Sequence, residues 1–592
     1  MTFRGFDAEL LGGLGRRGAT DAQIHLLQRV LRAVEPASLL SQHVSSIPGA
    51  ASEVPRAHEA LLSHAAIGQP MRNLLWRICA NAAAVAPPEC AAVLADVAAD
   101  TASNDKQFRV NTAEYAQRLG ELLPGIRSQV IERFRAAWKS GDDLSRAADE
   151  MACLVAATGR DVTALERALV HAPLDDVIDV LLPPLKRYQV ACVVQGVREL
   201  VGLSTLEPSA RHLTEESRWG PATARLREFL AQVTGCVVGI EVDAVDKPSA
   251  GRLARRRVTE LLDQYVAGHR LLTITLDPRV LVARVGALDT EEVGRRKVTV
   301  RKAHPLVPHW PSGLREGLRM AHLARVTESP LAAAALSWAA LEACGVHRRP
   351  EKLAAALSLQ ALRQQVAETH QLVHQSVTAA AKFTGSRSVL RPLTVLAGHA
   401  EVDEHRRLCD LNTWVDVLLP SRDRDTPALT AARAALDSLE LAPLAAHQVA
   451  EWRERLAEPA SCAEWLGHTE NRLRTLLEAL YGARNLTLHA GMFSAADDEV
   501  LGQGGLLVVD FTLEFLGNWY RHADGNETPF DIVEQLALRQ HRICGRMRHR
   551  RNPLYPLDIG RLTSPNCPTG WGRITPGITP GVTPAGTETA PD

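Results

Sequence analysis

The sequence predicts a mainly α-helical protein with one small α/β insertion. Apolar residues recur at helical spacing over most of the N-terminal third and over most of the chain after residue 313. Between residues 187 and 305 the pattern changes to short runs rich in β-branched residues, parts of which alternate. A chain of 592 residues is longer than one hydrophobic core comfortably supports, so we expect several domains.

The N-terminal region, residues 1–186, is predicted to be a helical domain. Asp21 is the expected N-cap of an early helix, and helical patterns follow at 107–138 and 162–182. The glycines of GGLGRRG (12–18) match the GxGxxG pattern of dinucleotide sites, which requires a buried strand directly before it. The preceding FDAELL contains no β-branched residue, so we expect a loop there and no nucleotide site.

Residues 187–305 are predicted to form the α/β domain. Its expected strands are YQVACVVQGV (188–197), CVVGIEVDAV (236–245) and LLTITLDPRVLVARV (271–285), and KVTVRKAH (297–304) is a candidate for a further strand. The segment RLARRRVTELLDQYVAG (252–268) lies between the second and third runs and has a helical pattern.

Residues 313–552 are predicted to be helical again. The clearest segments are PLAAAALSWAALEACG (330–345), 351–382, 461–490 and GGLLVVDFTLEFLGNWYRH (504–522). After Pro553 the periodicity ends, and the chain finishes in low-complexity Thr, Pro and Gly. Because this composition buries little apolar surface, we expect residues 553–592 to be disordered and the tail beyond about 556 to be dispensable.

Composition narrows the functional classes. The chain has 67 Lys and Arg against 68 Asp and Glu. This balance argues against a strongly basic protein that binds polyanions over its whole surface. The ten cysteines are placed singly, without a CxxC pair, so no zinc ribbon or disulfide framework is readable. The N-terminus lacks the pattern of a signal peptide, and no apolar run is long enough to span a bilayer. We therefore expect a cytoplasmic protein without a membrane segment.

Several His and Arg residues are spaced as candidate metal or phosphate ligands. His370 and His374 fall four apart on a predicted helix, but no obvious third ligand accompanies them, so a polar helix face is favoured and no metal or cofactor is expected. Three basic clusters are candidate phosphate sites: Arg255, Arg256 and Arg257; Arg295, Arg296 and Lys297; and Arg546, Arg548, Arg550 and Arg551. The last follows closely after the motif below and is the predicted RNA-binding cluster.

The most informative segment is YGARNLTLHAG (481–491), at the end of an amphipathic helix. At about 100° per residue, Asn485 and His489 lie about 40° apart on one face, with Arg484 beside them. Asn485 can orient the imidazole, and arginine offers a planar fork for a phosphate. A histidine that moves protons near neutral pH and an arginine that stabilises phosphorane charge suffice for RNA cleavage without a metal.

A structural interpretation competes with this one. The loose pattern Arg-x4-His arises by chance in a chain so rich in arginine. Arg484 and His489 could simply bond the last carbonyls of a helix that Gly491 ends.

LEALYGARNLTLHAG resembles the signature helix of HEPN-domain proteins, which carries Arg, usually a polar residue, and then His after four to six intervening positions. Tyr481 precedes Arg484 by three residues, and an apolar helix follows, as in that family. LSWAALEAC (336–344) is similar to the Trp-x-x-Leu-Glu helix of the larger phage-defence-type, Apea-like HEPN domains. The resemblance covers about 320–550. The long stretch between the two helices departs from the family pattern, and extra helices or a lid would account for it.

The resemblance implies a metal-independent endoribonuclease with a site composed from two chains. Arg484, Asn485 and His489 would be catalytic, with Tyr481 and Glu342 in support; RNA would be the substrate, in a homodimer. Toxin or abortive-infection roles, with an antitoxin or trigger protein as partner, belong to the same family. The alternatives are a non-catalytic HEPN scaffold that binds nucleotide, RNA or a protein, and a purely structural helical adaptor. Because an unpaired buried acid is costly, Glu342 is predicted to pair with Arg484.

Overall fold

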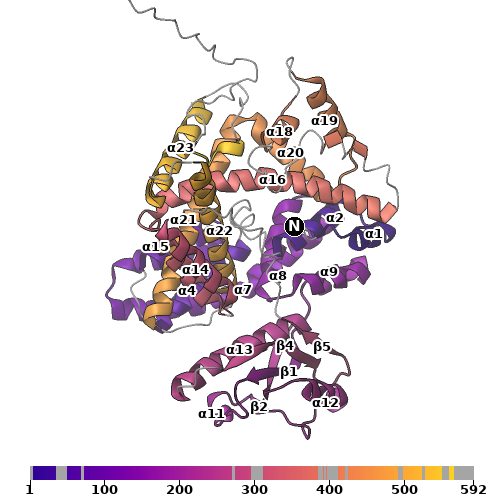
Figure 1. Cartoon of the computed structure of the whole chain (residues 1–592), viewed down its shortest axis with the longest axis vertical. Coiled ribbons are helices and arrows are strands. Elements are labelled where there is room, and N and C mark those ends of the chain that lie inside the picture. The colour runs from indigo at the N-terminus through magenta and orange to yellow at the C-terminus, as the bar shows by residue number, and fades with distance from the viewer. Residues whose placement is uncertain are drawn as a thin grey trace, which may run out of the picture.

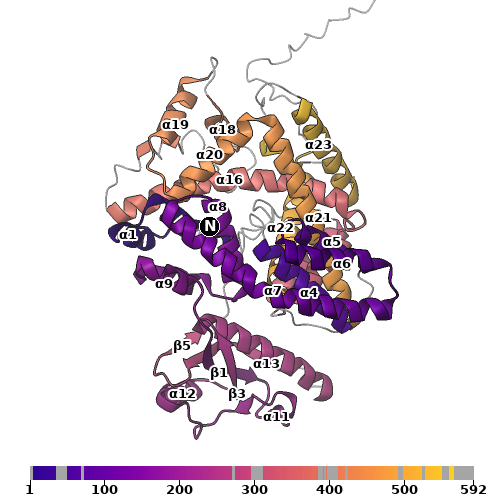
Figure 2. The ribbon, with the colours of Figure 1, turned by 180° about the vertical axis from the view of Figure 1, so that it is seen from behind.

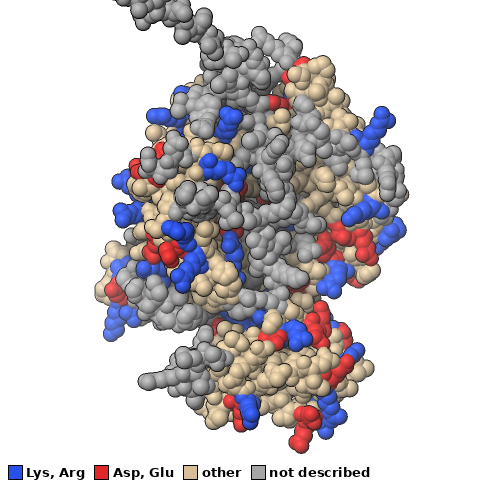
Figure 3. All heavy atoms as spheres, in the orientation of Figure 1, with Lys and Arg blue, Asp and Glu red and all other residues tan. Residues whose placement is uncertain are grey.

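The computed structural model describes residues 5–34, 50–67, 72–269, 274–294, 311–327, 329–384, 391–392, 395–396, 411–420, 425–490, 498–522, 527–549 and 559–565. It is mostly helical, 74% helix and 8% strand with one small antiparallel sheet, which confirms the predicted fold class (Figure 1). Lys and Arg are interspersed with Asp and Glu over the described surface visible in Figure 3, as the balanced composition predicts. Within these ranges, none of the helices has the length and apolar character needed to cross a bilayer.

The N-terminal helices form two cores joined by one long helix. The helices are α1 (Ala8–Arg16), α2 (Asp21–Val34), α4 (Ala50–Ile67), α5 (Arg72–Ala83), α6 (Pro88–Ala99), α7 (Asp105–Ser140), α8 (Leu144–Ala157), α9 (Val162–His171) and α10 (Val177–Leu181). The first core gathers α1, α2, α8, α9 and α10, and the second gathers α4, α5 and α6. The long helix α7 contributes Phe134 to the first core and Phe108 to the second.

Two local predictions near the N-terminus are wrong. The segment GGLGRRG was expected to be a loop, but its first five residues belong to α1, whose N-cap Asp7 accepts from the backbone N–H of Glu9 at 2.8 Å. Helix α2 is capped by Thr20 and not by Asp21, because Thr20 and Gln23 exchange backbone-to-side-chain hydrogen bonds of 3.0 and 3.3 Å. This reciprocal pair is a capping box, which satisfies two of the unpaired groups at a helix start.

The α/β domain is a five-stranded antiparallel sheet covered on both faces. Its elements are β1 (Lys186–Gln195), α11 (Leu203–Leu206), β2 (Arg211–His212), α12 (Thr223–Gln232), β3 (Cys236–Ala244), α13 (Lys247–His269), β4 (Thr275–Arg284) and β5 (Thr290–Val293), in sheet order β2-β3-β1-β4-β5. Helix α13 packs on one face and α12 on the other. The three predicted strands are confirmed, β5 was not predicted, and the candidate strand 297–304 lies outside the described residues.

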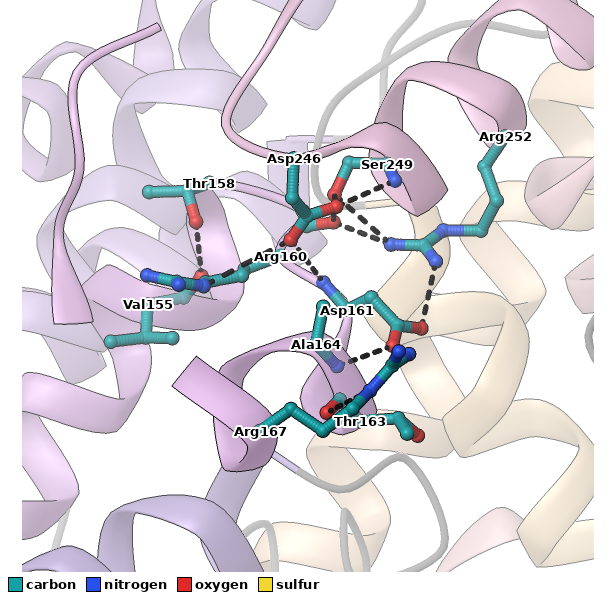
Figure 4. A network of polar contacts seen from close by, with 11 residues as sticks. Val155, Thr158, Arg160, Asp161, Thr163, Ala164, Arg167, Asp246, Ser249 and Arg252 are labelled. Atoms are coloured by element: carbon teal, nitrogen blue, oxygen red, sulfur yellow. Dashed lines mark hydrogen bonds and ion pairs between the residues drawn. The ribbon is translucent and has the colours of Figure 1, made fainter. Parts of the chain in front are cut away.

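A polar network joins the α/β domain to the start of α9 and to the turn before it (Figure 4). Asp246 accepts from the backbone N–H of Asp161 at 3.2 Å and from that of Ser249 at 2.8 Å. Arg252 forms an ion pair of 3.1 Å with Asp161 and donates to the carbonyl of Gly159 at 2.6 Å. Both aspartates begin helices, so each carboxylate caps a helix and also connects the two parts of the chain.

Replacing Arg252 by alanine is expected to loosen this connection, because Asp161 loses its ion pair and Gly159 loses a charged donor. Backbone amides of residues 159–164 should then exchange hydrogen several-fold faster, measured by mass spectrometry. Arg256→Ala is the control, since Arg256 pairs with Glu260 within the same helix at 3.4 Å. Equal exchange rates in both variants would contradict the connecting role of Arg252.

The C-terminal helices share one continuous core, which runs from Leu314 to Leu562. The elements are α14 (Ser312–Val326), α15 (Pro330–Ala343), α16 (Pro350–Thr384), α18 (Leu411–Leu418), α19 (Pro427–Asp437), α20 (Pro443–Ala457), α21 (Pro459–Ala490), α22 (Asp498–His522), α23 (Pro529–His549) and the 3-10 turn η5 (Ile559–Arg561). The long stretch between α15 and α21, for which the sequence allowed either extra helices or a lid, contains the helices α16, α18, α19 and α20.

The tail predicted to be disordered from residue 553 is ordered at residues 559–565. Ile559 and Leu562 are buried in the main core. Arg539 of α23 donates to the carbonyl of Leu562 at 2.7 Å and to that of Ser564 at 2.8 Å. The sequence prediction failed because two apolar residues in a short segment give no periodicity, although each can occupy a preformed core site.

The N-terminal helices pack directly against the C-terminal helices. Gln28 of α2 accepts from the backbone N–H of Leu444 at 3.1 Å, and Arg32 forms a buried ion pair of 3.3 Å with Glu368 of α16. His25 and His447 meet edge to face, with ring centroids 4.9 Å apart. The contact between the two helical regions thus contains buried basic groups that face one another.

Acid is expected to weaken the folded state through His25. Burial lowers the pKa of His25 to about 4, and His447 and Arg29 beside it act in the same direction. Between pH 6.5 and 4 the unfolded chain therefore binds more protons, so the free energy of unfolding falls as pH falls through this window, by up to about 3 kcal/mol. Urea midpoints at pH 7 and pH 5 measure the effect, and the drop should be smaller in His25→Gln. An equal drop in both proteins would contradict the assignment.

Candidate active site

Helix α21 carries the motif and is held in the bundle by close packing. Its apolar residues Leu476 and Leu480 face α22, where a Cβ added to Gly504 would meet Leu476 at 3.0 Å and one added to Gly505 would meet Leu480 at 2.8 Å. A Cβ at Gly505 would also stand 3.0 Å from Ser337 of α15. Helices α15, α21 and α22 therefore approach closely at these two glycines, where an added Cβ would have to displace side chains of the motif helix and of α15.

Arg484 is held on two sides. Its Nη1 donates to Asn485 Oδ1 at 3.1 Å, and its Nη2 lies 3.6 Å from Glu342 Oε1 on α15. The same carboxylate oxygen accepts from Trp338 Nε1 at 3.0 Å. The predicted pairing of Glu342 with Arg484 is confirmed. The Arg484 side chain is 28% exposed, so a phosphate could reach the guanidinium without unfolding the bundle.

Tyr481 lies at the edge of this cluster. Its ring centroid is 5.3 Å from that of Trp338, with the rings tilted by 55°. Trp338 is buried, whereas Tyr481 is half exposed. The predicted supporting residue therefore combines a packed contact to α15 with an aromatic surface open to a ligand.

Asn485 and His489 occupy the final turns of α21. Asn485 is partly exposed, and its carbonyl oxygen is engaged by Arg484 rather than left free for a ring nitrogen. His489 belongs to the helix, which ends at Ala490, but its side chain lies outside the described residues. The predicted bond between Asn485 and the imidazole therefore stays a prediction.

Arg548 of the predicted RNA-binding cluster does not lie beside Arg484. Arg548 Nη2 lies 3.7 Å from the place that a Cβ of Gly467 would occupy, 17 residues before Arg484 on α21, or about 25 Å along the helix. The cause is the course of α23, which packs on the early part of α21, as the bond of 3.0 Å between Gln540 and Glu470 shows. Arg546 and Arg548 are exposed, while Arg550 and Arg551 lie outside the described residues.

The histidine pair on α16 does not present a chelating face. The His370 ring packs edge to face on Trp414 at 5.1 Å, and burial lowers the pKa of His370 to about 4, with His374 acting in the same direction. His374 is exposed. Among the residues that the structure describes, no group of three or more His, Cys, Asp or Glu side chains is placed to hold a metal ion.

One contact near the motif was not foreseen from the sequence. Arg77 of α5 forms an ion pair of 2.5 Å with Glu478, so the N-terminal region touches the motif helix one turn before Tyr481 (Figure 2). The two residues are 401 positions apart, and no local pattern marks either of them. Only the packing of α5 against α21 brings them together.

No protein-family model matches the chain, and no curated protein or solved structure matches it. Membership of the HEPN family therefore stays a prediction from the motif residues.

Proposed function

We propose that this chain is a metal-independent endoribonuclease of the HEPN type that acts in anti-phage defence or as a toxin. One observation carries the proposal: Arg484 of the motif is oriented by Asn485 and Glu342 yet remains partly exposed at the end of α21. A structural role for Arg484 would not require Asn485 and His489 beside it in the last turns of α21, whereas the proposed chemistry uses all three residues.

In the proposed reaction, His489 removes the proton from a ribose 2′-hydroxyl. The 2′-oxygen then attacks the adjacent phosphorus, the bond to the 5′-oxygen breaks, and that oxygen takes up a proton. The products are a 2′,3′-cyclic phosphate and a 5′-hydroxyl. The guanidinium of Arg484 stabilises the additional negative charge on the phosphorane, and Glu342 keeps that guanidinium in place.

The site is proposed to be completed by a second copy of the chain, so that two motif helices face each other in a homodimer. RNA is the proposed substrate, and an antitoxin or trigger protein is a further proposed partner. Tyr481, one turn before Arg484, is 50% exposed, which leaves its ring available to such a facing copy.

The direct test incubates purified protein with total cellular RNA and compares wild type with His489→Ala, with and without EDTA. Wild type should produce fragments ending in cyclic phosphate in both conditions, and the variant should not. Equal fragmentation by the variant would sink the proposal.

A non-catalytic HEPN scaffold is the second candidate. It is favoured by the ion pair between Glu342 and Arg484, since a neutralised arginine is what a structural role requires. An intact RNA profile, together with stable RNA or protein binding by wild type, would support this candidate.

A further inference from the structure

One face of α21 is exposed from the N-terminal part of the helix to the motif, and we call this face the strip. At about 100° per residue, positions 467, 471, 474, 478 and 485 fall within about 60° of one another around the helix axis. Asn471 and Arg474 on this strip are exposed, and Glu478 and Asn485 are partly exposed. The core-facing leucines occupy the opposite side, so the strip is a continuous polar surface.

Three arginines from three different helices lie along this strip. Arg548 of α23 stands beside Gly467, Arg474 belongs to α21 itself, and Arg77 of α5 lies at Glu478. Figure 2 shows α23 near the upper part of α21 and α5 near its lower part. Because α5 and α23 lie far apart in the sequence, no local motif predicts that their arginines line the same face of α21.

The positive charge on the strip is only partly neutralised. Arg474 donates to the amide oxygen of Asn471 at 2.9 Å, and within the described ranges neither Arg474 nor Arg548 forms an ion pair with a carboxylate. Of the acidic residues nearby, Glu478 pairs with Arg77 at 2.5 Å, and Glu464 Oε1 lies 3.6 Å from His468 Nε2, away from Arg474 and Arg548. Two guanidinium groups thus keep their charge available for an anion.

An aromatic side chain completes the pattern. Tyr481 is 50% exposed and lies between Glu478 and Arg484 along the helix. Arginines that follow a phosphate backbone, together with an exposed ring on which a base can stack, are the elements of single-stranded nucleic-acid binding.

We propose that this strip binds single-stranded RNA through Arg548, Arg474 and Tyr481 and delivers it to the motif. The inference rests on the proposed function, since the motif chemistry selects RNA as the ligand. From position 467 to position 485 the strip is about 27 Å long, which corresponds to about eight nucleotides of a stacked strand at about 3.4 Å each.

Fluorescence anisotropy with labelled single-stranded RNA tests the strip, using the full chain with His489→Ala so that the probe stays intact. Adding Arg474→Glu and Arg548→Glu together should weaken binding at least tenfold. The slope of log affinity against log salt should fall in magnitude by about 1.4, since each lost phosphate contact on a single strand is worth about 0.7. Tyr481→Ala should weaken binding roughly fivefold or more.

The matched control is Arg167→Glu on α9, because Arg167 is exposed and, among the described residues, bonds to the carbonyl of Thr163 in its own helix, at 3.4 Å. It should leave affinity and salt slope unchanged. Oligonucleotides shorter than about eight residues should bind more weakly than longer ones. Circular dichroism verifies that each variant is folded.

The inference is overturned if the parent protein does not bind the RNA, if the double variant binds as tightly as its parent, or if Arg167→Glu weakens binding equally. Failure of the proposed function looks different. Wild type that binds RNA through the strip without cutting it would remove the nuclease proposal and leave this inference standing.

Discussion

Replacing Arg484 or His489 by alanine is expected to lower the rate of RNA cleavage by two or more orders of magnitude. His489 supplies the proton transfer and Arg484 the charge stabilisation, and each of these contributions is typically worth a hundredfold or more. Initial rates on one defined RNA measure the effect.

Asn485→Ala should lower the rate of RNA cleavage by a smaller factor. The carbonyl oxygen of Asn485 orients Arg484 at 3.1 Å but does not touch the reacting atoms in the proposed scheme. The fold should survive in all three variants, since Arg484 and Asn485 are partly exposed. A matched loss of unfolding free energy and of activity in Arg484→Ala would instead point to the structural role, in which Arg484 only neutralises Glu342.

Ending the chain after residue 556 is expected to destabilise the C-terminal helices strongly. The deletion removes Ile559 and Leu562, whose full burial is worth about 3–6 kcal/mol together. It also takes two carbonyl acceptors from Arg539 and the hydroxyl of Thr563 from the buried Arg363. Urea unfolding followed by circular dichroism should show a clearly lower midpoint.

Ending the chain after residue 565 is the control, because it keeps every described contact of this segment and should change stability by less than about 0.5 kcal/mol. The difference between the two truncations isolates residues 557–565. If both shortened proteins unfold at the same urea concentration, the segment does not support the core.

The regular elements were accessible from the sequence because their signals are local. The α13 and α16 helices and the strands β1, β3 and β4 appear near their predicted positions, since each has its own hydrophobic period. The loop expected at GGLGRRG failed because glycine propensity was given more weight than the Asp7 cap and the packing of α1.

The site was predictable only as far as one helix and its neighbour. The motif fixed Arg484 and Asn485 on α21, and the Trp-x-x-Leu-Glu helix supplied Glu342 as a partner for Arg484, which the 3.6 Å contact confirms. The places of Arg77 and Arg548 depend on how α5 and α23 cross α21, and tertiary packing alone determines that. Of the predicted arginine cluster, Arg548 is exposed as expected but lies beside Gly467 and not beside Arg484.

The contacts between the first and last thirds of the chain bear on how the protein is made. Arg77 meets Glu478 across 401 residues, and Gln28 meets Leu444 across 416. At about 5–20 residues per second, the ribosome needs roughly 20–80 s to supply those partners. Throughout that interval the side of α2 that later contacts α20 has nothing to pack against. These contacts therefore form only after the C-terminal helices have been synthesised, and until then the uncovered side of α2 is a surface through which the nascent chain can aggregate.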